Sequence, residues 1–168
     1  ASARGLIVDG KPGLFMDELY RSDVVYANGA ETARQLPTFL GNHDMGRTGF
    51  FINQGVANAS AEEKLRRSIM SHELMYLSRG VPVVYYGDEQ GFVGDGNDQD
   101  SRQNMMPSQV ATYNDDDLLA TDKTTADDNF DSGHPYYQAF AKYADVYFSH
   151  AALRYGKQDV IYSQATPG

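Results

Sequence analysis

The sequence predicts an α/β fold with parallel strands, of the kind from which (β/α) barrels are built. Two short apolar runs, residues 36–40 and 81–86, each lead directly into polar residues. The first run leads into Asn-His-Asp at residues 42–44 and the second into Gly-Asp-Glu at 87–89, and a strong helical pattern lies between them. Because a strand–helix–strand unit places its strands side by side and parallel, both polar sets are expected at one edge of a sheet.

The composition supports a folded domain and excludes several classes of function. Of the 168 residues, 41% are hydrophobic and 12% aromatic, which is enough for a packed core. The formal net charge of -9 argues against a nucleic-acid partner, because its phosphates would be repelled. No apolar run approaches the roughly 20 residues that span a bilayer, so no membrane partner is expected. The absence of cysteine removes disulfides and thiolate chemistry.

The first part of the chain is expected to contain one helix and one strand. Residues 1–10 are expected to form a loop or the remnant of a strand. Apolar residues at helical spacing predict a short amphipathic helix from about residue 12 to residue 22, and the first strand follows at 36–40. The glycine-containing segment 45–58 is expected to be irregular.

The strongest helix signal covers residues 61–79. Ser60 and Glu63 occupy the positions of a capping box, and Gly80 stands where a helix commonly ends. The strand expected at 81–86 is almost entirely apolar, which is typical of a parallel strand buried on both faces.

The remainder of the chain begins with a long polar segment, residues 87–131. A loop of this length in a compact domain is usually functional or disordered. Pro135 suits the first turn of a helix, which the apolar pattern extends over residues 135–149. A single further strand is expected at 159–163.

Four segments in this order resemble glycoside hydrolase family 13, the α-amylase family. They are Phe39 to Asp44, Gly80 to Glu89, Gly96 to Arg102 and Ala151 to Gly156. The first two are similar to the family segments at the seventh and eighth barrel strands. The third resembles the family loop Asn-Asp-Pro-x-x-Arg with Gln99 in place of proline, and the fourth resembles the passage into the family's C-terminal β-domain.

This resemblance implies a fold and a domain division. Residues 1–156 are expected to form the last strand–helix units of a (β/α)8 TIM barrel, a partial barrel of the α/β class. Residues 157–168 are expected to start a C-terminal β-domain with its first strand. The start of the sequence, without an initiator Met or a visible signal peptide, suggests a piece of something longer.

The resemblance also implies the site residues. Asp44 corresponds to the family's third carboxylate, which accepts hydrogen bonds from sugar hydroxyls and stabilises the oxocarbenium-like transition state. His43 is implied as a donor to the same sugar. Asp98 and Arg102 resemble the pair that holds a neighbouring glucose unit, one accepting and the other donating. Asn42 belongs to the same substrate-binding motif and is expected to fix the loop through its side-chain amide.

The carboxylates that cleave the bond have no counterpart in this chain. Retaining glycosidases flank the scissile bond with two carboxyl groups roughly 5 Å apart, a nucleophile and an acid/base. The segment Gly5 to Asp9 echoes the nucleophile motif, but Ile7 stands where that motif has arginine, so Asp9 is interpreted as a turn or cap residue. We therefore expect the isolated chain to be inactive and to contribute Asp44 to a longer enzyme.

The expected function is part of an α-amylase-like retaining hydrolase that cleaves α-1,4-glucosidic bonds in starch or maltooligosaccharides. Its expected partners are the α-glucan substrate and the remainder of the barrel. One alternative is a transglycosylase or isomerase of the same family, and another is a non-catalytic glucan-binding module. Because polymeric starch is extracellular for microbes, the expected location is secreted or periplasmic.

No cofactor or metal site is expected in this chain. Oxygen-bearing side chains alternate from Asp95 to Ser101 as in a calcium loop, but the glutamate at the twelfth position is missing, so a solvated acidic loop is favoured. The resemblance leaves calcium open for the full-length enzyme, in parts of the barrel that this chain does not contain.

Five further side chains carry interpretations. Phe50, Phe51 and Tyr113 have aromatic faces that match the apolar face of a sugar ring, but they fit the role of buried loop anchors equally well. Arg47 and Glu89 are expected to brace the rim of the site.

Overall fold

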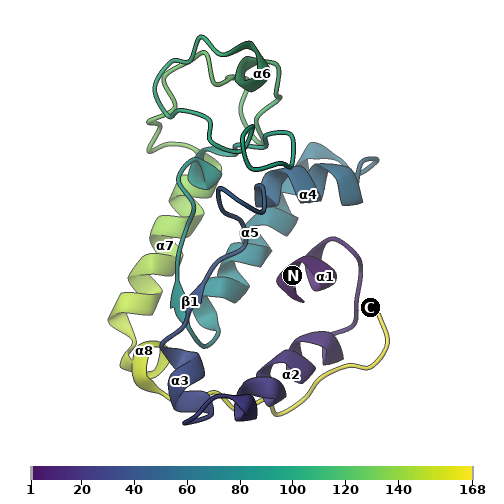
Figure 1. The fold of residues 1–168 in the computed structure, drawn as a ribbon, viewed down its shortest axis with the longest axis vertical. Helices are drawn as coiled ribbons and strands as arrows, with labels where there is room; N and C mark the ends of the chain where they lie inside the picture. Colours follow the sequence, from purple (N-terminus) through teal and green to yellow (C-terminus); the bar gives the residue numbers. More distant parts are fainter. Residues whose placement is uncertain (1, 168) are drawn as a thin grey trace.

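The computed structural model of the chain contains a two-stranded parallel sheet that lies between helices (Figure 1). The structure describes residues 2–167, and for residue 2 its backbone alone; residues 1 and 168, the ends of the two expected domain ranges, lie outside the described part. The helical elements are α1 (Ser2–Ile7), α2 (Leu14–Arg21), η1 (Ser22–Val25), α3 (Ala30–Arg34), α4 (Thr48–Gly55), α5 (Ala61–Leu77), η2 (Asp88–Gln90), α6 (Ala111–Asn114), α7 (Pro135–Ser149) and α8 (Ala151–Tyr155). The strands are β1 (Pro37–Thr38) and β2 (Val81–Pro82).

The strand–helix–strand order is confirmed. β1 and β2 are parallel, with Pro37 opposite Val81, and α5 connects them. Because the strands are parallel and paired in this register, the chain segments that follow them emerge at the same end of the molecule. Figure 1 shows the long 87–131 segment, with η2 and α6, at that end.

The strands are shorter than expected, and β2 is not buried on both faces. The ladder bonds are Val81 N–H to the Leu36 carbonyl and Val83 N–H to the Thr38 carbonyl, both 2.9 Å. Val81 and Val83 are 44% and 43% exposed. A strand is covered on both sides only where neighbouring strands and helices flank it, and the described residues contain two strands. The closed curvature of a barrel is therefore not formed by residues 2–167.

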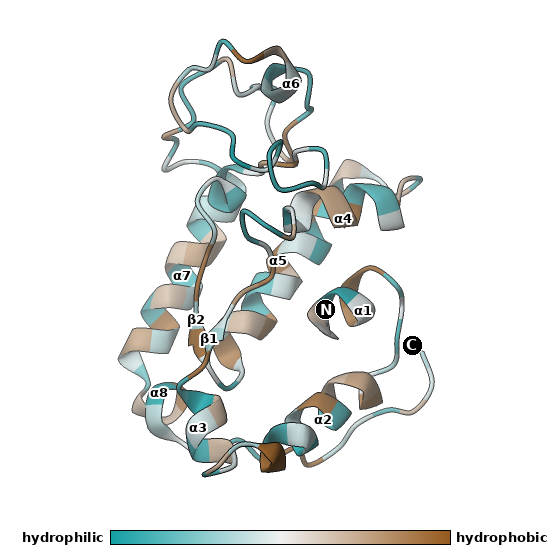
Figure 2. Ribbon diagram, in the orientation of Figure 1, coloured by the Kyte–Doolittle hydropathy of each residue, from teal (hydrophilic) through white to brown (hydrophobic). Residues whose placement is uncertain are grey.

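The two long helices follow their local signals. Ser60 Oγ accepts a hydrogen bond from the Glu63 N–H (3.1 Å), which is the expected N-cap of α5. Pro135 begins α7, as expected. The helices pack through the ring of His72, which stacks on Phe140 at 4.0 Å between centroids. Figure 2 shows the apolar strand segments running between these helices.

Two expectations about local structure were wrong. Residues 2–7 form helix α1 rather than a loop or strand, and α4 occupies most of the 45–58 segment expected to be irregular. Both helices are stabilised by packing: Arg4 of α1 lies 4.1 Å from the centroid of the Phe51 ring of α4, and Ile52 of α4 is fully buried. Such contacts decide the conformation of short segments whose own helix preference is weak.

The strand expected at 159–163 is also absent from the structure. The segment runs extended along α2 instead, where the Leu14 N–H donates to the Gln164 carbonyl (2.9 Å) and Ser163 Oγ donates to Asp17 (3.0 Å). A strand needs a second strand to complete its hydrogen bonds, and none lies beside this segment among the described residues. That residues 157–168 begin a separate β-domain stays a prediction.

Among the helices that the structure describes, none combines the length and the apolar character needed to cross a membrane.

Candidate functional site

A tight turn carries Asn42, His43 and Asp44 beyond the end of β1. The Asn42 N–H donates to the Gly46 carbonyl (3.2 Å), and Asn42 Oδ1 accepts from the backbone N–H groups of Asp44 (2.9 Å) and Met45 (2.8 Å). Gly46 has φ +85°, a conformation that glycine adopts without strain. Asn42 therefore fixes the loop through its side-chain amide, as expected, and the turn presents Asp44 with 66% of its side chain exposed.

The loop after β2 places Arg102 close to Asp44, with Asp98 beside Arg102. Arg102 Nη2 lies 3.6 Å from Asp98 Oδ2 and 3.9 Å from Asp44 Oδ1. His43 Nε2 lies 3.4 Å from the same oxygen, Asp44 Oδ1. The structure thus brings His43 and Arg102 to the Asp44 carboxylate and Asp98 to Arg102, and Asn42 supports the turn that carries Asp44.

This cluster is suited to binding hydroxyl groups. Asp44 and Asp98 accept hydrogen bonds, whereas Arg102 and the imidazole of His43 donate them, so neighbouring hydroxyls of a sugar would find both kinds of partner. The four side chains are roughly half exposed or more. Exposed ion pairs contribute only about 0–1 kcal/mol to stability, so the cluster adds little to holding the fold together.

A buried arginine lies beneath the cluster. Arg47 is 0% exposed, and its Nε donates to Gln103 Oε1 at 2.7 Å. Its Nη1 donates both to the Tyr86 carbonyl (2.7 Å) and to Asp88 Oδ1 (3.0 Å). The expectation that Arg47 braces the rim agrees with these bonds.

Gln103 is a residue of this network that the sequence did not indicate. It is 0% exposed, and its Nε2 donates to Asp116 Oδ2 (3.3 Å). Burial, and then the negative charge of Asp95, raise the pKa of the Asp116 carboxyl to about 6. The only signal in the sequence was that Gln103 follows Arg102, because a glutamine in a polar segment gives no indication of burial.

Tyr85 forms a second connection between the segment after β2 and the 97–103 loop. Its ring lies 4.4 Å from the Arg47 guanidinium, and its hydroxyl donates to the Ser101 carbonyl (3.0 Å). Burial raises the pKa of Tyr85 to about 12, which keeps the hydroxyl protonated at neutral pH. Glu89 braces its own turn by accepting from the Gly87 N–H (2.8 Å), and burial raises the pKa of its carboxyl.

The three aromatic candidates all have packing partners in the structure. Phe50 packs against the hydrophobic core and meets Phe51 edge-on, with ring centroids 5.6 Å apart. Phe51 lies under Arg4. Tyr113 donates its hydroxyl to the Gln99 carbonyl (3.2 Å). Of the two interpretations left open, these contacts favour loop anchors over sugar platforms.

The acidic loop does not fit a calcium site. Asn97 Oδ1 accepts from the N–H groups of Gln99 and Asp100, both at 2.9 Å, and its Nδ2 donates to Asp100 Oδ2 (2.6 Å). These side chains satisfy one another within the loop. Within the described residues, no three or more His, Asp or Glu side chains are grouped so that they could hold a metal ion.

Asp9 lies in a bend directly after α1 and is exposed. This agrees with its interpretation as a turn residue.

Parallel strands joined by a helix, with polar groups beyond their carboxyl ends, define an α/β protein. A family model described as "Alpha amylase, catalytic domain" matches residues 14–164. The chain therefore belongs to the α-amylase family, glycoside hydrolase family 13, as the four sequence segments indicated.

Sequence similarity to individual curated proteins supports this family assignment. The chain is 41% identical over 162 residues to an α-amylase of Streptomyces lividans, covering 96% of this chain and 18% of that protein. It is 32% identical over 119 residues to a cyclomaltodextrin glucanotransferase of Bacillus sp. (strain 1-1), covering 71% of this chain and 12% of that protein. The chain thus spans less than a fifth of these two curated relatives.

The fold is shared with a solved α-amylase. The crystal structure of an Anoxybacillus α-amylase aligns with a TM-score of 0.66 at 19% sequence identity, covering 97% of this chain and 29% of that one. At this identity the likeness shows the fold alone, and it supports the α/β class.

Proposed function

We propose that this chain supplies the sugar-holding side of the active site of an α-amylase-like retaining glycoside hydrolase. The proposed substrates are α-1,4-linked glucans, namely starch and maltooligosaccharides. The observation that carries the proposal is that His43 Nε2 and Arg102 Nη2 lie 3.4 Å and 3.9 Å from Asp44 Oδ1, in a chain of this family.

In the proposed mechanism Asp44 acts as an anion. It accepts hydrogen bonds from sugar hydroxyls, and these bonds strengthen as positive charge develops on the ring in the transition state. His43 donates to the same sugar, while Asp98 and Arg102 hold the neighbouring glucose unit. The nucleophile and the acid/base come from the remainder of the barrel, so this chain makes no covalent bond to the substrate.

The first test compares the 168-residue chain with the intact protein, meaning the natural polypeptide that carries it. The isolated chain is expected to release no reducing sugar from starch or maltoheptaose, whereas the intact protein is expected to do so. Cleavage by the purified chain would contradict the proposal, because the bond-breaking carboxylates would then lie within it.

A second test replaces the proposed transition-state stabiliser. In the intact protein, Asp44→Asn is expected to lower kcat by about 10²–10³-fold with little change in KM, since the lost interaction forms mainly in the transition state. Asp9→Asn is the matched control and is expected to leave both constants unchanged. An Asp44→Asn protein with normal kcat would remove Asp44 from the mechanism.

Transglycosylation is a second candidate, favoured by the similarity to a cyclomaltodextrin glucanotransferase. Chromatography of the products from starch separates the two reactions, because a hydrolase gives linear sugars and a glucanotransferase gives cyclic ones. A third outcome, binding of maltoheptaose without any cleavage by the intact protein, would identify a glucan-binding module.

We also propose a secreted or periplasmic location, because polymeric starch does not enter microbial cells. Detection of the intact protein by antibody in the cell fractions of its host tests this directly.

A further inference from the structure

We propose that Arg47 is a positioning residue that sets the distance between Asp44 and the Asp98–Arg102 pair. It acts through Gln103 and the 97–103 loop and does not itself touch the sugar. This inference deepens the proposed function and rests on it for its consequence in catalysis. Its structural part, the attachment of the loop, is independent of any substrate.

Arg47 directly follows the turn that carries Asp44. The bond from the Asn42 N–H to the Gly46 carbonyl closes the turn one residue before Arg47. The turn also touches the loop directly: a Cβ atom on Gly46 would lie 3.2 Å from the backbone of Gly96. A shift of Arg47 relative to its partners would therefore move the turn that carries Asp44.

Gln103 determines where Arg102 leaves the protein interior. Both polar atoms of its side-chain amide are hydrogen-bonded: Oε1 accepts from Arg47 Nε (2.7 Å), and Nε2 donates to Asp116 Oδ2 (3.3 Å). Since Gln103 is fully buried and Arg102 is its neighbour in the chain, the exposed guanidinium projects from a fixed point. The hydrogen bond from the Tyr85 hydroxyl to the Ser101 carbonyl holds the residue on the other side of Arg102.

The shape of arginine is essential to this role. The planar fork bonds three segments at once: Gln103 in the loop, the Tyr86 carbonyl after β2, and Asp88 at the start of η2. Lysine carries its charge at a single atom and cannot reach the three acceptors in this geometry. Arg47→Lys therefore keeps the positive charge that faces Asp88 but loses some of the hydrogen bonds that join these three segments.

The experiment uses three variants of the intact protein. Arg47→Lys and Gln103→Met each break the bond between these two residues, and neither changes the net charge. Arg79→Lys is the matched control, because Arg79 is also paired with a buried aspartate, Asp23, and lies 5.2 Å from a tyrosine ring, but it precedes β2 at the other end of the strands.

Two quantities are measured for each variant. Amide hydrogen exchange in residues 97–103 is expected to accelerate by about tenfold in Arg47→Lys and in Gln103→Met, as expected for the loss of one buried hydrogen bond. With maltoheptaose, kcat/KM is expected to fall by about 10–100-fold in both, because small displacements of positioning groups have effects of this size. Arg79→Lys is expected to change neither quantity, although its melting temperature falls.

The outcomes separate this proposal from the proposed function. If the intact protein neither cleaves nor binds maltoheptaose, the proposed function fails. The hydrogen-exchange data alone then test whether Arg47 holds the 97–103 loop. Unchanged exchange in residues 97–103 of both Arg47→Lys and Gln103→Met overturns the proposal. So does a loss of kcat/KM in Arg79→Lys as large as that in Arg47→Lys, because the effect would then follow stability rather than position.

Discussion

Two arginines with largely buried side chains lie at opposite ends of the strand pair, and their surroundings differ. Arg47 follows β1 at the carboxyl end of the strands, whereas Arg79 precedes β2 at the amino end. Each is paired with a buried aspartate and lies near a tyrosine ring. The difference between them lies in the other groups that each arginine holds.

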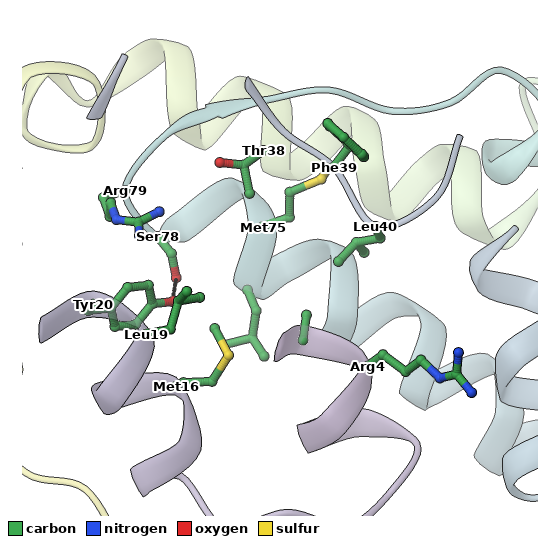
Figure 3. A pocket seen from close by; sticks show the side chains of 12 residues that line it. Arg4, Met16, Leu19, Tyr20, Thr38, Phe39, Leu40, Met75, Ser78 and Arg79 are labelled. Carbon is green, nitrogen blue, oxygen red and sulfur yellow. Dashed lines mark hydrogen bonds between the residues drawn. The ribbon is translucent and has the colours of Figure 1, made fainter. Parts of the chain in front are cut away.

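Arg79 joins packed elements. Its Nε donates to Asp23 (2.5 Å), and its backbone N–H donates to Gln158 Oε1 (2.7 Å), so it ties η1 to the C-terminal segment. It lines a cavity of about 320 Å³ whose other walls are largely apolar. Figure 3 shows Arg79 beside Tyr20 and Ser78, with Leu19 and further apolar side chains around the same cavity.

Arg47, by contrast, bonds to loops that carry exposed polar side chains. Through Gln103 it is joined to Arg102, and through the turn to Asp44. A buried arginine–aspartate pair thus contributes to packing at one end of the molecule and to the placement of a surface cluster at the other. What distinguishes the two roles is the position relative to the carboxyl ends of the strands, where folds with parallel strands build their sites.

Removing the carboxylate beside Arg47 is expected to destabilise the protein most. Asp88→Ala leaves a fully buried guanidinium without its counter-charge and is expected to lower the free energy of unfolding by about 3–5 kcal/mol. Urea denaturation of the intact protein measures this. Asp98→Ala removes a partner from an exposed pair and is expected to cost less than about 1 kcal/mol. Equal losses in the two variants would mean that burial of the Arg47 pair has no energetic consequence.

A pair of tyrosine substitutions separates stability from positioning. The Tyr20 hydroxyl donates to Ser78 Oγ (2.9 Å) near Arg79, and the Tyr85 hydroxyl donates to the Ser101 carbonyl (3.0 Å) near Arg47. Tyr20→Phe and Tyr85→Phe are each expected to lower the free energy of unfolding by about 1 kcal/mol. Only Tyr85→Phe is expected to raise KM for maltoheptaose as well. A raised KM in Tyr20→Phe would show that the two ends are not functionally distinct.

A dependence of stability on pH is also expected at the Arg47 end. The pKa of Asp116 is raised to about 6 in the folded protein, so the folded state binds more protons than the unfolded state between pH 4 and pH 6. The contribution of Asp116 to stability is therefore present below about pH 4 and is lost as the pH rises through 6. Asp116→Asn, which keeps an acceptor for Gln103, is expected to flatten urea midpoints measured across this range. An unchanged pH profile would show that this carboxyl does not titrate as described.

Local signals predicted the elements that depend on a few neighbouring residues. Ser60 and Glu63 marked the start of α5, and Pro135 marked that of α7, because a cap and a first-turn proline act within one turn of helix. The parallel order of β1 and β2 also followed from the sequence, since the helix between them leaves little choice of connection.

Short runs such as residues 42–44, and the order of these runs, were enough to indicate the family, the α/β order and the residues at the strand ends. The folded structure was needed to show that residues 2–7 are helical, that 159–163 is unpaired and that Arg47 and Gln103 are buried together. Burial and pairing depend on partners far away in the chain; Arg47 and Gln103 are 56 residues apart. No pattern within either segment specifies such a partner, so the bond between them becomes evident only when the chain is folded.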